Sequence, residues 1–285
     1  MSTLRIMSNN IWKCDKNYAA WEAQGADCSA PTRAKGFARV YTETKPDILG
    51  IQECSPLMAE CIMDHMKQDG APYALLWGRD TPILYRYDRL ELVDCGYCNY
   101  PENVPGYEGS FNNQKTKSYS TGVFRIKENG RLMIFATTHL WWKLSDPAAG
   151  GSYQAYSDEA RVYQLNQLLD HVRDLKAQYN CPAVIAGDMN TVYTSPAVQS
   201  ALARGYVHGY DVAVEYRDET NGHHYCYADG YDHYENPKDF QASIDHILLA
   251  GCPEGAVKRF QRYAPDWYMP LSDHFPVWID VDLTV

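Results

Sequence analysis

The chain has 285 residues, of which 45% are hydrophobic and 22% are charged, and its formal net charge is −10. This is ordinary globular composition, and the absence of any run of about twenty apolar residues argues against a membrane span. An acidic chain without a run of Lys and Arg also argues against tight nucleic-acid binding, although bound divalent cations can give a nuclease the local positive charge that it needs.

The first part of the chain is predicted to alternate strands with helices. Residues 1–8 lack the apolar stretch and cleavage pattern of a signal peptide, so we expect a cytoplasmic protein. Alternating polarity predicts strands, and apolar residues at helical spacing predict helices. In chain order we expect a strand at 4–8, a loop at 13–30, a helix at 31–44, a buried strand at 48–51 and a helix at 56–69.

Two hairpins are predicted next. Strands at 81–87 and 90–94 are joined by Tyr87-Asp88-Arg89, and strands at 119–127 and 131–139 are joined by Glu128-Asn129-Gly130, in which Asn-Gly is a strong turn signal. The remaining expectations are a helix at 159–178, a strand at 183–186, an extended loop at 206–240 and strands at 243–250 and 276–283.

No repeat, low-complexity tract or linker divides the chain, so residues 1–285 are expected to form one domain. Hairpins mixed with strand–helix–strand units predict an α/β sandwich. The nine cysteines are an odd number in a long chain, which does not indicate a disulfide framework. The only closely spaced pair, Cys95 and Cys98, lacks the second pair that a zinc site requires, so reduced cysteines are expected.

Polar residues follow several predicted strands, where scaffolds tend to place chemistry. Their carboxylate and amide oxygens suit Mg²⁺ or Mn²⁺, and an Asp–His pair is a usual way to activate water. The segments concerned are Ser8-Asn9-Asn10, Gln52-Glu53, Thr138-His139-Leu140, Gly187-Asp188-Met189-Asn190, Ile244-Asp245-His246 and Ser272-Asp273-His274-Phe275-Pro276.

These motifs, in this order from residue 5 to about residue 283, resemble those of the endonuclease/exonuclease/phosphatase superfamily, which includes deoxyribonuclease I-like enzymes. The resemblance implies a four-layer α/β/β/α sandwich, in which two mixed β-sheets pack face to face with helices outside. It also implies a metal-dependent phosphoesterase that uses Mg²⁺, with Mn²⁺ as an alternative.

The resemblance assigns roles to single residues. Glu53 matches the principal metal ligand, assisted by Asn10 and Asp273, and His274 matches the general base that Asp245 holds. The other matches are His139, which stabilises charge on the phosphate, and Asp188 and Asn190, which orient the water and the phosphate. The carboxylate partner of His139 is left open between Asp80 and Glu91.

Trp141 and Trp142 follow the Thr-His-Leu segment and are candidates for a substrate-binding wall, or equally for packing. The acidic charge favours a small phosphorylated metabolite or a phosphodiester head group as substrate. A DNA or RNA nuclease is the second hypothesis, although the sequence shows no basic patch. A binding protein that has lost catalysis is the third, and the intact motifs argue against it. Oligomeric state is not indicated by the sequence.

Overall fold

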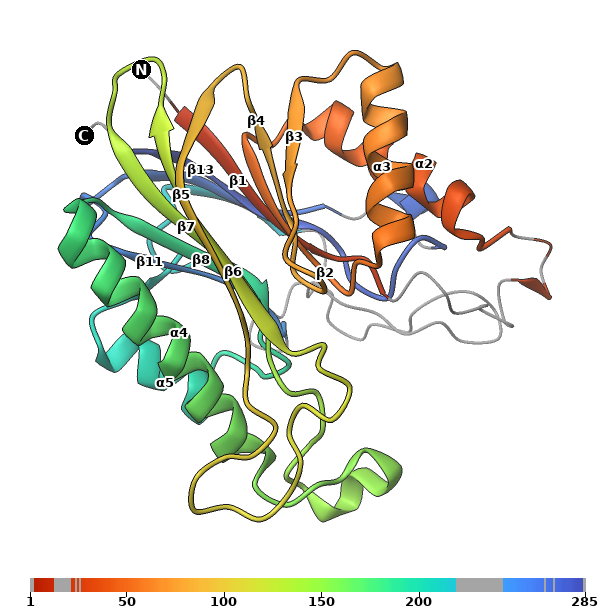
Figure 1. Cartoon of the computed structure of the whole chain (residues 1–285), viewed down its shortest axis with the longest axis vertical. Coiled ribbons are helices and arrows are strands. Elements are labelled where there is room, and N and C mark those ends of the chain that lie inside the picture. The colour runs from red at the N-terminus through yellow and green to blue at the C-terminus, as the bar shows by residue number, and fades with distance from the viewer. Residues whose placement is uncertain are drawn as a thin grey trace.

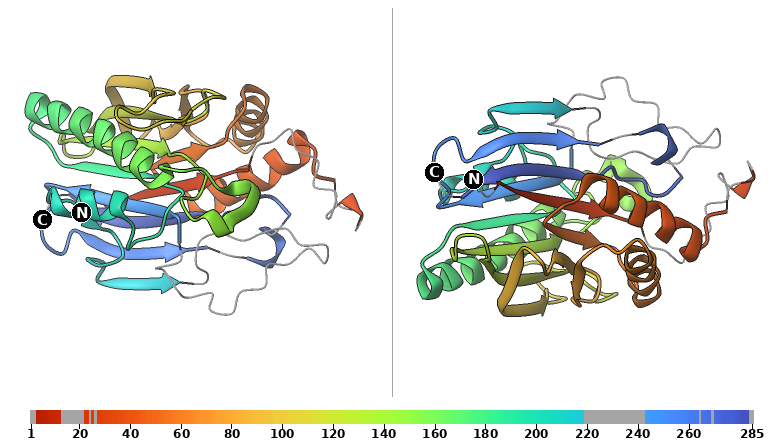
Figure 2. Two further views of the ribbon diagram at one scale, coloured as in Figure 1. Left: turned by 90° about the horizontal axis from the view of Figure 1, so that it is seen from below. Right: turned by 90° about the horizontal axis from the view of Figure 1, so that it is seen from above.

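The computed structural model describes residues 3–12, 22–23, 25, 27–218, 243–263, 265–268 and 270–283. Within these residues two mixed β-sheets pack face to face, and helices cover the outer face of each sheet (Figures 1 and 2). The predicted four-layer α/β/β/α sandwich is therefore confirmed. Of the helices in the described part of the chain, none combines the length and apolar character that a membrane crossing requires.

One sheet has seven strands and is built around the first strand of the chain. β1 pairs in parallel with β2 and antiparallel with β13. In spatial order the strands are β10 (Glu215–Asp218), β12 (Val257–Arg262), β13 (Val277–Asp282), β1 (Thr3–Asn10), β2 (Ile48–Gln52), β4 (Ile83–Arg86) and β3 (Tyr73–Leu76).

The other sheet has six strands. β7 and β8 run parallel at its centre, and β11 is antiparallel to β8. In spatial order the strands are β5 (Leu90–Asn99), β6 (Ser118–Ile126), β7 (Leu132–His139), β8 (Ala183–Asp188), β11 (Asp245–Ala250) and β9 (Val207–His208).

Serine and proline mark the starts of several helices. Ser29 precedes α2 with a proline in the first turn, and the Ser55 hydroxyl accepts a hydrogen bond from the Met58 amide at the start of α3. The helices are α2 (Ala30–Thr44), α3 (Pro56–Gln68), α4 (Ser157–Tyr179) and α5 (Pro196–Ala203), with short 3₁₀ segments at Pro147–Ser152 and Asp266–Tyr268.

Alternation along the strands divides the apolar side chains among three cores. In β1, Leu4 and Ile6 join the core between the sheets, whereas Met7 joins the core beneath α2 and α3. The third core packs α4 and α5 on the six-stranded sheet, and Leu168 of α4 is fully buried there. Both sheets are thus covered on their outer faces, so the polar strand ends lie at the rim of the sandwich.

The predicted hairpin of strands 81–87 and 90–94 is wrong. β4 pairs with β2 and β3 in the seven-stranded sheet, whereas β5 pairs with β6 in the six-stranded sheet. The turn between β4 and β5 therefore carries the chain from one sheet to the other. The second predicted hairpin, β6 with β7, is confirmed.

Some elements were not predicted. β3, α5 and β12 were missed, and β9 and β10 lie within the predicted loop at 206–240. Residues 219–240 of that loop, and residues 13–21, 24 and 26 of the first predicted loop, lie outside the described residues. Cys95 and Cys98 are exposed free thiols on β5, and their separation of three residues directs them to opposite faces of the strand.

The two sheets approach one another closely near the rim, at Gly50 of β2 and Thr137 of β7. A Cβ atom on Gly50 would lie 2.3 Å from the Thr137 hydroxyl oxygen. Two residues further along β2, the Gln52 amide donates to the same hydroxyl at 2.8 Å. The missing side chain at Gly50 therefore lets a hydrogen bond join the sheets directly behind Glu53.

We predict that Gly50→Ala destabilises the protein by about 1–3 kcal/mol, because the added methyl group must push the two sheets apart. Chemical denaturation followed by circular dichroism measures this change. Gly151→Ala is the control, since a Cβ there meets nothing within 4 Å. Equal stability of both variants would show that the sheets separate without cost.

Candidate active site

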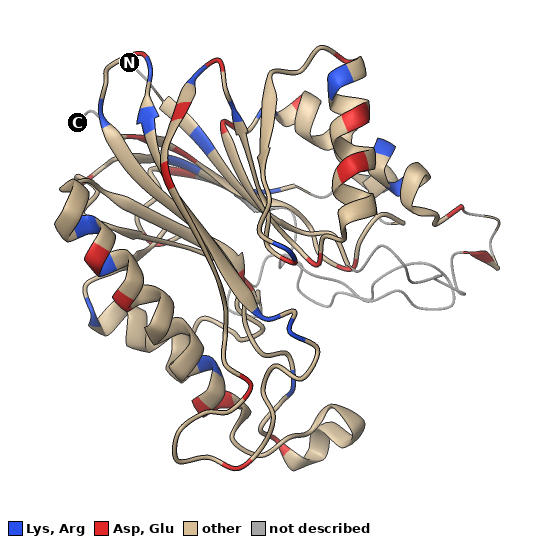
Figure 3. Ribbon diagram, viewed as in Figure 1, with Lys and Arg blue, Asp and Glu red and all other residues tan. Residues whose placement is uncertain are grey.

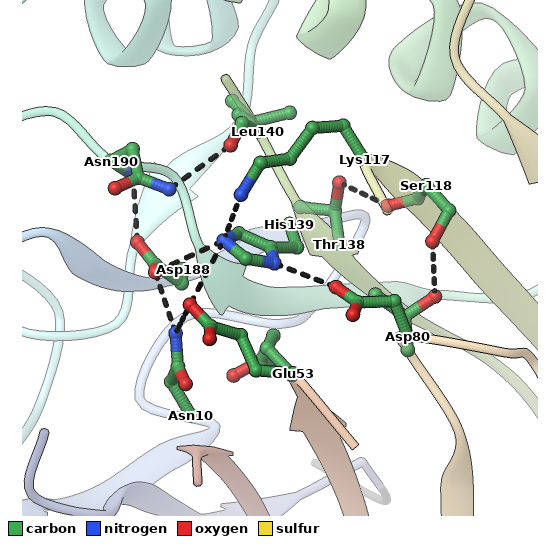
Figure 4. A network of polar contacts seen from close by, with 12 residues as sticks. Asn10, Glu53, Asp80, Lys117, Ser118, Thr138, His139, Leu140, Asp188 and Asn190 are labelled. Atoms are coloured by element: carbon green, nitrogen blue, oxygen red, sulfur yellow. Dashed lines mark hydrogen bonds and ion pairs between the residues drawn. The ribbon is translucent and has the colours of Figure 1, made fainter. Parts of the chain in front are cut away.

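The predicted site residues lie at one rim of the sandwich, at or near the ends of strands from both sheets. Figure 4 shows Asn10, Glu53, His139, Asp188 and Asn190 close together. β1 ends at Asn10, which pairs with Gln52 just before Glu53. In the facing sheet, Asp188 lies between His139 on one side and Asp245 on the other. The strand registers therefore bring together residues that are far apart in the sequence.

The chain turns sharply after three of these strands. Trp12, Glu53 and Asn190 have left-handed backbone conformations, with φ angles of 45°, 61° and 50°. Such angles cost a residue other than glycine about 1–3 kcal/mol each and are concentrated at functional sites. Here they follow β1, β2 and β8, the strands that deliver Asn10, Glu53 and Asp188.

Asn10 connects two carboxylates from different sheets. Its amide nitrogen donates to Asp188 Oδ2 at 2.8 Å and lies 3.4 Å from Glu53 Oε1. The other oxygen of Asp188 accepts from the Asn190 backbone amide at 2.8 Å. Burial opposes ionisation of Asp188, but the nearby His274 and His139 outweigh it and lower its pKa. Asp188 is therefore held as an anion at the centre of the site.

His139 is oriented by Asp80, which resolves the question of its partner. His139 Nδ1 lies 2.8 Å from Asp80 Oδ2, whereas Glu91 pairs with Arg125 at 3.1 Å. His139 Nε2 then faces the site, 3.5 Å from Asp188 Oδ2 and 3.8 Å from Glu53 Oε1. A ring fixed through one nitrogen presents the other to a substrate in a defined direction.

Lys117 is a site residue that the sequence did not reveal. It is 5% exposed, and its ammonium group contacts His139 Nε2 (Figure 4). Lys117 directly precedes β6, whose first residue, Ser118, pairs with His139. Burial opposes ionisation of Glu53, but His139 and Lys117 outweigh it and lower the pKa of Glu53.

His274 and Asp245 form the predicted pair. Their contact, from His274 Nδ1 to Asp245 Oδ2, is 2.6 Å long. Burial disfavours the charged imidazolium, but Asp245 and Asp188 outweigh it and raise the pKa of His274 well above its usual value. The Ser272 hydroxyl accepts from the His274 amide and donates to the Asn10 carbonyl, at 3.1 and 2.7 Å, so it ties this loop to the end of β1.

Arg33 of α2 holds two of the site segments from below. It is 1% exposed and donates to the Leu271 carbonyl at 2.9 Å and to the Trp12 carbonyl at 2.7 Å. Leu271 leads into the Asp273–His274 segment, and Trp12 follows Asn10. Arg33 thus fixes the backbone on which these side chains stand.

The residues that could hold a divalent cation are Glu53 and Asp273. Asp273 Oδ1 is buried and has no hydrogen-bond partner. Burial, together with repulsion from Glu53 and Asp188, raises the pKa of Asp273 to about 7. In the described part of the chain no three His, Cys, Asp or Glu side chains form a complete set of metal ligands as they stand. Mg²⁺ needs only one or two protein carboxylates, because it keeps several waters, so the site fits this ion.

A pocket of about 540 Å³ opens over these residues. Its lining includes Glu53, Lys117, His139, Asp188 and His274. The two tryptophans lie differently in its wall. Trp142 is 45% exposed, whereas Trp141 is 3% exposed and packs edge-on against Phe111 with ring centroids 6.0 Å apart.

The strand-end carboxylates, the two Asp–His pairs and the sandwich that carries them define a phosphoesterase-like site. The sequence matches the profile of the Endonuclease/Exonuclease/phosphatase family over residues 10–274. The chain therefore belongs to this family, whose members are hydrolases that act on phosphate esters. No curated protein sequence matches the chain significantly.

Solved structures of related fold span nearly the whole chain. A family protein from Bacteroides thetaiotaomicron is 19% identical with a TM-score of 0.75, covering 100% of this chain and 99% of its own. A mannosyl-6-phosphatase from B. thetaiotaomicron VPI-5482 is 22% identical with a TM-score of 0.72, covering 98% and 99%. D. rerio TDP2, complexed with a single-strand DNA product, is 16% identical with a TM-score of 0.64, covering 99% and 100%. At these identities the likeness shows the fold alone.

We predict that Asp273→Asn raises the melting temperature of the cation-free protein at pH 8 by about 3 °C or more. Because the pKa of Asp273 is raised to about 7, its stabilising contribution is present at low pH and is lost as pH rises through 7. The Asp273→Asn variant carries no charge at this position and avoids that loss. Its advantage in melting temperature shrinks at pH 5, where the Asp273 carboxyl group of the folded wild type is protonated. Differential scanning fluorimetry with chelator present measures both values.

Asp64→Asn is the matched control, since Asp64 lies exposed on α3. An unchanged melting temperature for Asp273→Asn at pH 8 would show that the charged Asp273 carboxylate does not destabilise the fold.

Proposed function

We propose that this protein is a divalent-metal-dependent phosphoesterase that hydrolyses a small phosphorylated metabolite or a phosphodiester head group. The observation that carries the proposal is the arrangement in one pocket of the His274–Asp245 pair, the carboxylates Glu53 and Asp273, and the buried cation Lys117. The arrangement offers a base, a set of hard oxygen ligands and a positive charge for a phosphate.

His274 is the general base of this proposal. Asp245 fixes its Nδ1 and directs Nε2 toward the attacking water. The negative charge that raises the pKa of His274 would be offset by a divalent cation bound beside Asp188 and Asp273, so that Nε2 is free to accept the proton. Asp188 Oδ2 lies 3.8 Å from His274 Nε2 and can hold the same water by a hydrogen bond. The water oxygen then attacks phosphorus opposite to the ester oxygen, which leaves as an alcohol once it is protonated.

The remaining residues stabilise charge on the phosphate. When bound, Mg²⁺ or Mn²⁺ would be held by Glu53 and Asp273 and would supply neutralising charge for the phosphate oxygens. Lys117 donates to a phosphate oxygen, and His139, fixed by Asp80, donates beside it. Asn10 keeps Glu53 and Asp188 in register between the two sheets, and the Asn190 backbone orients Asp188.

The charge distribution supports a small substrate over a nucleic acid. Lys117 is the only Lys or Arg among the described residues that line the pocket. Along the ribbon of the described residues in Figure 3, Lys and Arg positions are interspersed with Asp and Glu positions. A nucleic-acid backbone requires several cations along its path. The structural likeness to a mannosyl-6-phosphatase agrees with a small substrate, and the likeness to TDP2 makes the nuclease hypothesis worth testing.

We predict that the protein hydrolyses p-nitrophenyl phosphate or bis-p-nitrophenyl phosphate with Mg²⁺ or Mn²⁺, and that a chelator abolishes the reaction. His274→Ala removes the base and lowers kcat by about 10²–10⁴-fold, and Glu53→Gln lowers the apparent affinity for the cation. Release of nitrophenolate measures both. His65→Ala, on α3 outside the pocket, is the matched control.

Wild-type rates in His274→Ala would rule out its role as base. Hydrolysis of neither ester, with or without cations, would favour the binding-protein hypothesis. Efficient nicking of supercoiled plasmid at the same enzyme concentration would favour a nuclease.

We predict that Lys117→Ala lowers kcat for the same esters by about 10²–10³-fold, because it removes a buried donor to the phosphate. Lys115→Ala is the matched control: Lys115 lies in the same turn but is exposed and does not line the pocket. Steady-state kinetics measure kcat for both variants. An equal loss of kcat in Lys117→Ala and Lys115→Ala would refute the role of Lys117.

A further inference from the structure

The pocket continues beyond the phosphate centre to a wall that carries no charge. We call this the neutral wall. Its members are Asn113, Gln114, Thr116, Trp142, Leu144 and Ser152. They come from two segments, residues 112–117 before β6 and residues 141–153 after β7, each adjacent in sequence to a residue of the centre: Lys117 and His139. Both segments line the same pocket as the phosphate centre, so a leaving group that extends along the pocket toward these segments would contact the neutral wall.

The first segment of the wall is a closed turn. The Asn112 side chain, 2% exposed, donates to the carbonyl groups of Tyr100 and Lys117, at 2.6 and 2.8 Å. Its oxygen accepts from the Lys117 amide at 2.9 Å. Two of these hydrogen bonds join the ends of the turn and the third anchors it to Tyr100, so the amides of Asn113 and Gln114 are presented by a held segment.

The second segment is held by two buried residues of α4. Arg161 donates to the Trp141 carbonyl at 3.1 Å. Gln164 accepts from the Trp141 amide at 2.8 Å and donates to the Phe111 carbonyl at 3.2 Å, so it connects the two segments of the wall. Farther along, the Leu144 amide donates to the Ser152 carbonyl at 2.9 Å. The wall is therefore organised before a ligand arrives, which reduces the entropy cost of binding.

The chemistry of the wall selects a class of leaving group. Trp142 offers a broad apolar ring, 45% exposed. Around it, Asn113, Gln114, Thr116 and Ser152 each provide both hydrogen-bond donors and acceptors. A hydroxyl group is likewise both donor and acceptor, and a sugar ring has an apolar C–H face beside its hydroxyls. The described wall lacks a second cation, so it does not suit a second phosphate.

We propose that the neutral wall binds a sugar, and that the substrate is the phosphate monoester of a monosaccharide. This inference rests on the proposed function. The reaction adds water across the ester: the water oxygen forms a new bond to phosphorus, the bridging P–O bond breaks, and the sugar oxygen takes a proton and leaves as a hydroxyl. Trp142 contacts the face of the sugar, and the two amides bind its hydroxyls.

The test compares mannose 6-phosphate and glucose 6-phosphate with p-nitrophenyl phosphate and adenosine 5′-monophosphate, all with Mg²⁺. We expect a hexose phosphate to have the highest kcat/KM. Asn113→Ala/Gln114→Ala should raise its KM about tenfold or more, equivalent to about 1.4 kcal/mol, and should raise KM for p-nitrophenyl phosphate by a smaller factor, because that ester has no hydroxyl groups for the two amides to bind. Trp142→Ala should raise KM for the hexose phosphate, and Trp142→Phe should restore part of it.

Tyr87→Ala, an exposed aromatic residue outside the pocket, is the control and should change none of these values. Metal-dependent hydrolysis of p-nitrophenyl phosphate, with no hexose phosphate preferred, would overturn the sugar inference and leave the proposed function standing. A preference for adenosine 5′-monophosphate that Trp142→Ala removes and the double amide variant does not would overturn it in favour of a base. Hydrolysis of no ester would defeat the proposed function itself.

Discussion

The hydrogen bond from Asn10 to Asp188 joins the two sheets at the rim on which the candidate site is built. Its donor ends the central strand of one sheet, and its acceptor ends a central strand of the other. Such a bond, 2.8 Å long, requires the strand ends to approach closely. Gly50 and the Gln52–Thr137 contact, which lie just behind the rim, provide that approach. The other contacts of the centre are made by residues at or next to these strand ends, so they depend on the same approach of the two sheets.

The approach also concentrates negative charge. Glu53, Asp80, Asp188 and Asp273 line one pocket, with Lys117 and two histidines between them. Burial makes each unpaired charge costly, so the site holds its carboxylates in mixed contacts instead of leaving them separate. Asp273 is the member left without a hydrogen bond at Oδ1. A site of this composition favours cations and phosphates together, as expected in a family that hydrolyses phosphate esters.

Much of this arrangement could be predicted from the sequence, because short apolar runs that end in polar residues mark strands whose ends face solvent. Glu53 after Ile48–Gln52 and Asn190 after Ala183–Asp188 are examples. The role assigned to Lys117 could not be predicted from the sequence, because a single lysine before a strand is ordinary surface composition. Its position follows only from the register that pairs Ser118 with His139. The Asn-Gly turn predicts that pairing, but not that the preceding side chain turns inward.

The sheet assignment of β4 and β5 could not be predicted for a related reason. Two short strands joined by a tight turn satisfy the local rules for a hairpin. Which sheet each joins depends on distant partners: β4 pairs with β2, and β5 with β6. The local sequence pattern therefore predicts where the two strands lie, but long-range packing determines which strands they pair with. Asp80, in the segment between β3 and β4, contacts His139 of the facing sheet because the two sheets pack together.

The left-handed residues at the rim have a consequence for how the protein can change. Trp12 and Glu53 hold conformations that glycine would adopt more readily; Glu53 is a residue of the centre, and Trp12 follows Asn10 by two residues. Replacing either residue with glycine would relieve the backbone strain and stabilise the fold. The same replacement would remove a side chain that lines the pocket. Substitution for stability alone would therefore change the lining of the pocket at these two positions.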